Sequence, residues 1–162
     1  MSVFKKLMNA ALFLSLSAGS FAADSAKAKD LVLAYYQHSN ALEYAELLPL
    51  FQPEAKIDIT WKYGAGHPDD EVSTTVAELD KYLDEETIRK SSEMMASYKE
   101  LTAKEEITSV NEDKDEILVE AIQTVSYEIE GYQGTSKQTD LFVLKQVDGQ
   151  LKITEMESVL EF

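Results

Sequence analysis

Hydrophobic and polar residues alternate along the second half of the chain, a pattern typical of strands. Between residues 117 and 129, Val119 and Val125 fall on one parity while Glu120 and Glu128 fall on the other. Successive side chains of a strand point to opposite faces, so this segment should bury one face and expose the other. The same pattern predicts strands over residues 55–61, 101–110, 117–129, 136–147 and 151–160.

Turn residues separate the last four predicted strands. We expect turns at residues 111–116, at residues 131–134 and at Asp148-Gly149, which is a preferred pair for a two-residue hairpin. Strands that follow one another through short turns predict an antiparallel meander.

The predicted strand over residues 136–147 carries apolar residues on both faces. Phe142 and Leu144 share one parity, whereas Leu141 and Val143 share the other. A strand with two apolar faces needs a cover on its outer side as well. We predict that a second copy of the chain supplies this cover, so the protein should form a homodimer through the sheet.

Helical spacing dominates the segments that precede these strands. Leu31, Ala34, Tyr35 and His38 recur at intervals of three and four residues and predict a helix over residues 25–39. A short second helix is expected over residues 42–51. Pro49 and Pro53 should bring it to an end, because proline has no backbone N–H to donate.

A third helix is expected after a loop over residues 62–73, which is rich in glycine, proline and aspartate. Thr74 or Thr75 can cap its start, and Glu78 is placed to complete a capping box. We expect this helix to continue, with a break, through residues 88–95. Its apolar positions are Val76, Leu79, Tyr82 and Leu83.

The order of helices first and strands afterwards predicts an α+β fold, in which the sheet covers the helices. Neither an internal repeat nor a linker suggests a second domain. Residues 23–162 are therefore expected to form one domain.

Residues 1–22 are typical of a secretory signal peptide. Lys5 and Lys6 precede an apolar stretch, residues 7–18, that is too short to cross a bilayer. Small residues in Ser20-Phe21-Ala22 predict cleavage between Ala22 and Ala23, and hence an exported protein, periplasmic or secreted. The alternative is a buried amphipathic N-terminal helix. The sequence contains no cysteine, which excludes a disulfide and an acylated cysteine anchor, so we expect no membrane anchoring.

The charge of the chain restricts its partners. Lysine and arginine total 15 against 30 acidic residues, a net charge of -15. Loss of Lys5 and Lys6 with the signal peptide would make the balance more negative still. A nucleic-acid partner is disfavoured because nucleic acids are bound by basic surfaces, and anionic membranes are disfavoured for the same reason. Solubility explains the acidity, and steering of a cationic ligand is the alternative.

Several segments resemble the nuclear transport factor 2-like superfamily, which includes ketosteroid isomerases and polyketide-cyclase-like proteins. These segments are Ala34-Tyr35-Tyr36, residues 45–55, residues 139–143 and residues 147–151. The resemblance implies a cystatin-like cone, in which a strongly curved, mainly antiparallel sheet wraps N-terminal helices in its concave face. It also implies a pocket inside the cone and frequent dimerisation through the sheet.

The resemblance to ketosteroid isomerases implies roles for particular residues. Tyr35 falls at the position of their oxyanion-binding tyrosine, and Asp140 falls at the position of their protonated aspartic acid. The position of their catalytic base is occupied by Ile59. Asp58 is one residue away and should therefore point to the opposite face of its strand. The base of that reaction does not follow from the resemblance.

Other residues are candidates for the pocket. Asp140 can face apolar surroundings that raise its pKa, or face solvent. Tyr35 can bind a ligand or simply pack in the core, and His38 can act as a base, contact a ligand or pack. His67 next to acidic residues suggests a metal, but a second histidine at ligand spacing is missing, so we expect no metal and no cofactor. The remaining pocket candidates, which can equally be core, are Trp61, Tyr63, Tyr82, Met94, Met95, Tyr127 and Phe142.

Three functions remain open from the sequence. The first is binding of a small apolar or aromatic molecule in the cone without catalysis. The second is a cofactor-free isomerase, lyase or cyclase in which Asp140 and Tyr35 stabilise an oxyanion while His38 moves a proton. The third is an accessory protein-interaction domain with a vestigial pocket.

Overall fold

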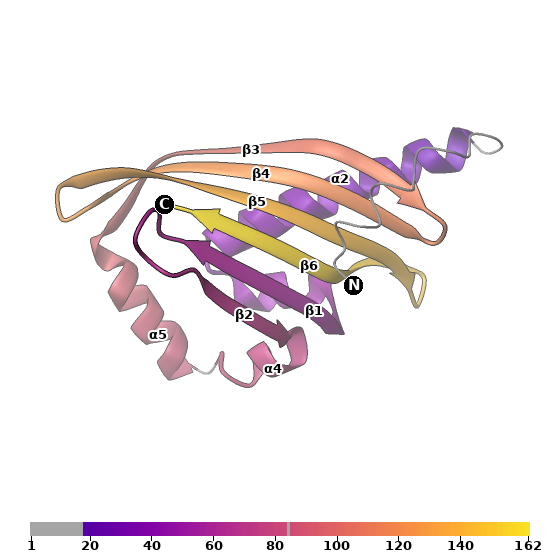
Figure 1. Ribbon diagram of the computed structural model, residues 1–162. Coiled ribbons are helices and arrows are strands. Elements are labelled where there is room, and N and C mark those ends of the chain that lie inside the picture. The colour runs from indigo at the N-terminus through magenta and orange to yellow at the C-terminus, as the bar shows by residue number, and fades with distance from the viewer. Residues whose placement is uncertain (1–17, 84) are drawn as a thin grey trace.

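A curved six-stranded sheet forms the body of the computed structural model, which describes residues 18–83 and 85–162 (Figure 1). The strands lie in the order β2-β1-β6-β5-β4-β3. The last four form the predicted antiparallel meander, and β1 pairs in parallel with β6 and antiparallel with β2. Their bounds are β1 Phe51–Lys62, β2 Asp70–Thr75, β3 Tyr98–Asp113, β4 Glu116–Ile129, β5 Tyr132–Val147 and β6 Gln150–Glu161.

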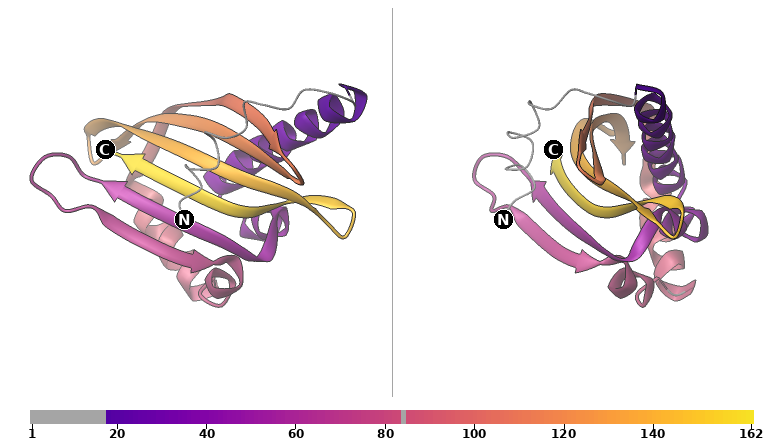
Figure 2. Two further views of the ribbon diagram at one scale, coloured as in Figure 1. Left: turned by 45° about the vertical axis from the view of Figure 1, so that its right-hand side comes forward. Right: turned by 90° about the vertical axis from the view of Figure 1, so that its right-hand side faces the viewer.

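One long helix lies across the concave face of this sheet, as the end-on view in Figure 2 shows. The helices are α2 Ala18–Asn40, α3 Tyr44–Leu47, α4 Val76–Asp80 and α5 Glu85–Met94, with the short 3-10 turns η1 Leu48–Leu50 and η2 Met95–Ser97. The arrangement confirms the predicted α+β cone. In the described part of the chain no helix is both long enough and apolar enough to cross a membrane.

The core lies between α2 and the inner face of the sheet. Val32 of α2 packs with Phe142 and Leu144 of β5 and Ile153 of β6, and all four are fully buried. The Phe142 ring meets the Tyr35 ring edge-on, with centroids 5.1 Å apart. This is a favourable geometry for aromatic pairs. The pattern of alternating residues therefore identified the buried face of the meander correctly.

The hairpins depend on residues that tolerate a positive φ. Asp148-Gly149 joins β5 to β6, with φ values of 52° and 78°, as predicted for a two-residue hairpin. Glu130-Gly131 joins β4 to β5 in the same way, with φ values of 51° and 86°. The turn expected over residues 131–134 is therefore wrong for residues 132–134, which already pair with β4.

The region before β3 departs from the prediction in two places. Residues 70–73 form part of β2 rather than a loop, because they pair with β1 as a polar edge strand that no hydrophobic alternation marks. The predicted second helix ends at Leu50, and Phe51 begins β1. Pro53 lies inside β1 where the pairing with β6 shifts, a position that tolerates the missing N–H.

The predicted cap of the third helix is confirmed. Thr75 accepts a hydrogen bond from the Glu78 backbone N–H, and the Glu78 carboxylate accepts one from the Thr75 N–H. The helix ends at Asp80 and a second helix, α5, follows from Glu85 to Met94, so the predicted break and continuation are confirmed, with Tyr82 inside the break.

The outer face of the sheet holds a second buried cluster of Leu118, Leu141 and Val143. Its burial confirms that the strand over residues 136–147 is covered on both faces. The predicted signal sequence lies mainly outside the described residues, and residues 18–22 form the start of α2. The single domain, the cleavage site and the homodimer stay predictions.

Candidate functional site

A buried carboxyl group on the inner face of the sheet is the centre of the candidate site. Asp140 of β5 is 1% exposed. The Tyr36 hydroxyl of α2 donates a hydrogen bond to Asp140 Oδ2 at 2.5 Å. Gln138 Nε2 donates to Oδ2 at 2.9 Å and to Oδ1 at 3.0 Å. A helix and a strand thus hold one acid with donors on both of its oxygens.

Burial raises the pKa of Asp140, because a charged carboxylate is poorly solvated there. Ser158, Tyr36 and Gln138 oppose this rise. Ser158 lies opposite Asp140 on β6, although its buried Oγ makes no hydrogen bond of acceptable geometry. Desolvation outweighs these neighbours, so the site favours the neutral acid more than water does.

Tyr35, the residue implied as the partner of Asp140, is not its hydrogen-bond donor in the structure. That donor is its neighbour Tyr36. Tyr35 instead packs against the rings of Phe142 and Phe51. Burial raises its pKa, and the charge of Asp140 adds to this, while Gln138 and Ser39 act in the opposite direction. Both tyrosines therefore lie beside the acid, and Tyr36 makes the direct contact.

A second polar group continues the site toward β3. Gln123 Nε2 of β4 donates to Asn40 Oδ1 at 3.1 Å and to Glu105 Oε1 at 3.0 Å. Asn40 is the last residue of α2, so this group closes the end of the helix against the sheet. Gln123 is buried, whereas Glu105 and Gln138 are half-buried. Gln123 lies opposite Gln138, so the two polar groups are neighbours on this face, and the second extends to residues that reach solvent.

An aromatic strip follows on the same face, toward the β4–β5 hairpin. Tyr98 and Tyr127 stack with centroids 5.7 Å apart. Tyr127 lies over Gly134, where an added Cβ would come within 2.6 Å of the ring. Tyr132, at the end of the strip, is 82% exposed. We define the inner strip as Tyr98, Tyr127, Ile129 and Tyr132 together with the polar residues Glu105, Gln123, Gln138 and Asp140.

Sequence reasoning identified Asp140 and Tyr127 but missed most of the inner strip. Gln138 and Tyr132 share the even parity of Asp140 along β5, which is the signal that could have found them. Tyr98 shares the face of Ile129 through strand pairing, which no local pattern reveals. The pairing register of the strands, rather than a local sequence motif, decides which residues form the strip.

Trp61 joins this face by register. It pairs with Leu160, and Leu160 pairs with Gln138. Residues in the same row of a sheet share a face, so Trp61 lies on the side of the inner strip. Phe142, in contrast, is fully buried under α2 and belongs to the core.

The other predicted pocket residues lie elsewhere or outside the description. His38 pairs with Glu43 through Nδ1 and Oε2 at 2.7 Å, at the end of α2. Tyr63 stacks on Phe162, and Tyr82 is 71% exposed. Met94 and Met95 fall at the junction of α5 and η2, but their side chains are outside the described residues.

Ile59 and Asp58 point to the faces of β1 that the sequence predicts. Ile59 is partly buried and packs against the main core cluster. Asp58 points to the outer face, where Lys56 pairs with its carboxylate. Lys56 and Ser73 lower the pKa of Asp58 despite the opposing effect of burial. An acid does not occupy the inner position of β1 that a base would need.

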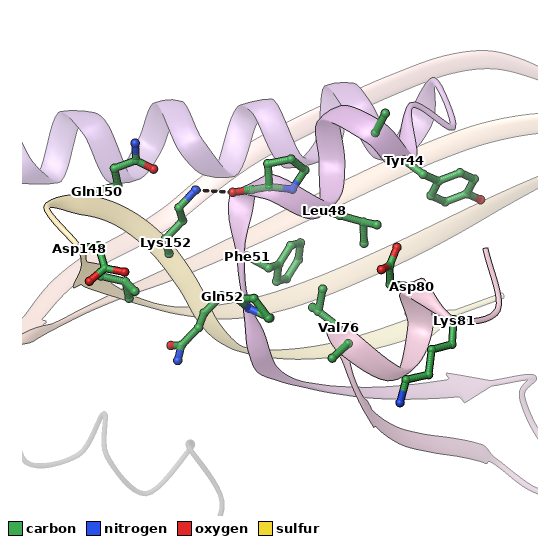
Figure 3. A pocket seen from close by; sticks show the side chains of 15 residues that line it. Tyr44, Leu48, Phe51, Gln52, Val76, Asp80, Lys81, Asp148, Gln150 and Lys152 are labelled. Atoms are coloured by element: carbon green, nitrogen blue, oxygen red, sulfur yellow. Dashed lines mark hydrogen bonds between the residues drawn. The ribbon is translucent and has the colours of Figure 1, made fainter. Parts of the chain in front are cut away.

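Two hollows open on other parts of the surface, although Asp140 of the inner strip and its neighbour Ser158 also line the second of them. One is a groove of about 710 Å³ at the start of β1, with Leu48, Phe51 and Val76 as its apolar floor (Figure 3). Lys152 crosses its edge and donates to the Pro49 carbonyl. The other, of about 720 Å³, lies on the outer face of the sheet. Its walls carry the acids Asp58, Glu71, Glu120 and Glu157.

Metal-binding residues do not cluster in the described chain. Over residues 18–83 and 85–162, no group of three or more histidine, cysteine, aspartate or glutamate side chains is close enough to hold a metal ion. His67 lies in the exposed turn between β1 and β2.

Comparison with solved structures identifies the fold. A ketosteroid isomerase-like protein from Erwinia carotovora atroseptica is 12% identical, with a TM-score of 0.55 over 82% of this chain and 92% of that one. An NTF2-like protein with a cystatin-like fold from Novosphingobium aromaticivorans is 14% identical, with a TM-score of 0.58 over 87% and 84%. The beta subunit of benzoate 1,2-dioxygenase from Burkholderia mallei is 10% identical, with a TM-score of 0.54 over 91% and 93%.

The chain thus has the nuclear transport factor 2-like fold that the sequence resemblance implied. No protein-family model matches the sequence, and comparison with curated protein sequences finds no significant match. The likeness is one of architecture, so function must be argued from the site.

Proposed function

We propose that this protein is exported and binds a small apolar or aromatic molecule on the inner strip. The proposal rests on one observation: aromatic side chains and polar groups follow one another along this face without a gap. Exposed and half-buried aromatic rings lead from Tyr132 through Tyr127 to the half-buried Gln138, which contacts the sealed acid Asp140. Apolar surface with a few convergent polar groups is typical of small-molecule sites.

The inner strip suits a flat ligand because of how its rings are held. Gly134 leaves room for the Tyr127 ring against the backbone, and Tyr98 stacks on that ring. Aromatic side chains provide large contact areas at little cost in conformational entropy. Two structural neighbours are named for ketosteroid isomerase and benzoate 1,2-dioxygenase. Both names refer to ring compounds, which supports this choice of ligand.

A thermal-shift screen of apolar and aromatic compounds tests the proposal. A ligand present at 100 times its Kd stabilises a protein by about 2.7 kcal/mol, so selective binders should raise Tm measurably. The shift should shrink in Tyr127→Ala, on the inner strip. It should persist in Leu48→Ala, a half-buried residue of the groove in Figure 3. Loss of the shift in Leu48→Ala alone would place the ligand in that groove and contradict the proposal.

A cofactor-free isomerase or lyase is the second candidate, and the raised pKa of Asp140 favours it. A neutral acid beside Tyr36 can donate a hydrogen bond to a developing oxyanion. The test is exchange of α-protons of a bound ketone for deuterium, followed by NMR. Exchange that Asp140→Asn abolishes supports catalysis, whereas binding without exchange supports the first candidate.

Export and dimerisation are parts of the same proposal. The mass of the protein purified from the periplasm or the medium should correspond to a chain that begins at Ala23.

The homodimer through the sheet would bring together two copies of the acidic outer groove. Salt screens such repulsion because the Debye length shortens as the ionic strength rises, so we expect the dimeric fraction in light scattering to increase between about 0.05 and about 0.5 M NaCl. A mass that stays monomeric at both concentrations contradicts the dimer.

A further inference from the structure

The charges on the inner strip are of one sign. Strand pairing places Glu100 opposite Tyr127, Glu105 opposite Gln123 and Asp140 opposite Ala121, so three carboxyl groups share this face. The pairing also places Lys99 and Lys104, the bases of β3 in these rows, beside Glu128 and Thr124 on the other face. Within the described rows from Tyr98 to Asp140, the lysines of β3 therefore face outward, and the charged side chains that face inward are all acids.

The basic residues near the inner strip form ion pairs with acids that lie off the strip. Lys104 pairs with Glu106 on the outer face, with Nζ and Oε2 3.3 Å apart. Arg89 and Lys90 of α5 are exposed and pair with Glu93 and Glu86 of the same helix. Glu105 instead accepts hydrogen bonds from the neutral amides of Gln123 and Asn40. These amides orient its carboxylate without neutralising it.

The aromatic rings of the strip lie beside these acids. The charge of Glu100 acts on the Tyr98 hydroxyl and that of Glu105 acts on Tyr36, as their raised pKa values indicate, although burial is the larger cause for both tyrosines. Ring faces attract cations, and carboxylates next to rings strengthen the attraction. An anion, in contrast, would meet like charge.

A buried polar atom on this face has no partner. Ser158 is 3% exposed, lies opposite Asp140, and its Oγ accepts no hydrogen bond within the described structure. Buried hydroxyl groups are nearly always satisfied by protein, water or a ligand. The deep end of the strip therefore holds an unpartnered hydroxyl beside Asp140, and the negative charge of the strip comes from Glu100 and Glu105.

We propose that the molecule bound on the inner strip is an organic cation, an ammonium group carried on an aromatic or apolar body. The apolar body lies against Tyr98 and Tyr127, and the ammonium group lies toward Glu105. This inference rests on the proposed binding function and narrows it to one class of ligand.

Three probes with the same ring system test the inference by isothermal titration calorimetry at pH 7. They are 2-naphthylmethylamine, which is a cation, 2-naphthalenemethanol, which is neutral, and 2-naphthoate, which is an anion. We expect the amine to bind about tenfold more tightly than the alcohol, and the carboxylate to bind most weakly. Tighter binding of the alcohol or the carboxylate overturns the inference and leaves the binding function standing. Failure of all three to bind contradicts both.

Variants separate a local charge from the overall acidity of the protein. Glu105→Gln should weaken amine binding several-fold and leave alcohol binding unchanged. Glu106→Gln is the matched control, because it removes the same charge from the same strand on the outer face. Equal losses in both variants overturn the inference. Glu100→Gln, at an exposed position, repeats the test should Glu105→Gln unfold the protein.

Discussion

The two halves of the inner face of the sheet differ in what they contact. Under α2, the strands present Phe142, Leu144 and Ile153, which are fully buried against the helix. Beyond the end of α2, the inner face presents Gln138 and Tyr127, which are half-buried, and Tyr132, which is exposed. Asp140 lies at the boundary. The comparison indicates that one half provides stability and the other half is available for binding.

The largest expected effect is on the covered half. Phe142→Ala should lower the free energy of unfolding by about 3–5 kcal/mol, because it leaves a cavity in a closely packed core. Urea denaturation measures this directly. Tyr132→Ala removes a ring of similar size from the exposed end of the same strand and serves as the control. Similar losses in the two variants would mean that the halves do not differ as described.

The boundary residue should have a smaller effect. Asp140→Ala leaves the Tyr36 hydroxyl and the Gln138 amide without their acceptor, which should cost about 1–3 kcal/mol. The same urea experiment measures it. Asp140→Asn keeps a carbonyl acceptor and should lose less. A loss for Asp140→Ala as small as that of an exposed residue would contradict the buried network.

The pH dependence of Asp140 has a defined sign. Its pKa is raised in the folded state above the ordinary value of 3.8, so the native protein binds this proton more tightly than the unfolded chain does. Its contribution to the free energy of unfolding therefore falls as the pH rises from 3.8 through the folded pKa. The difference between wild type and Asp140→Asn should decline over that range in pH-dependent denaturation.

Asp58, on the outer face, should show the opposite dependence of stability on pH. Its pKa is lowered below the ordinary value of 3.8. Its contribution is present above that value and is lost as the pH falls through the folded pKa. The difference between wild type and Asp58→Asn should thus decline toward acid pH. Curves of the same sign for the two variants would contradict the assigned environments.

The open half can be altered with little loss of stability. Gly134→Ala places a Cβ 2.6 Å from the Tyr127 ring, so the ring must move. Because a flexible side chain can move, we expect a loss of at most about 1 kcal/mol, with weaker ligand binding. Gly134→Ala should have no further effect on binding in a Tyr127→Ala background. An additional loss there would show that the glycine acts in another way.

The smallest effect on stability is expected at the tip of the strip. Tyr132→Ala should change the free energy of unfolding by less than about 0.5 kcal/mol, since the side chain is mostly exposed. Its effect should be on affinity for aromatic compounds, measured by calorimetry. Unchanged affinity would limit the binding site to the deeper part of the strip.

The sequence predicted the covered half better than the open half. Alternation along β4 and β5 marks a buried face, and Asp148-Gly149 specifies its hairpin without reference to the rest of the fold. The exchange of Tyr35 for Tyr36 as the donor to Asp140 could not be predicted. It depends on how α2 is rotated over the sheet, which only packing determines. Strand β2 was missed because a polar edge strand has no hydrophobic pattern.

The central claim is that a small molecule binds to the open half of the inner face. Its most direct test is a chemical-shift map of the isotopically labelled protein titrated with 2-naphthylmethylamine. The account predicts shifts of the Trp61 indole N–H, the Gln138 side-chain amide and the Gly134 backbone amide. Shifts confined to Leu48, Phe51 and Val76, in the groove of Figure 3, or no shifts at all, would contradict it.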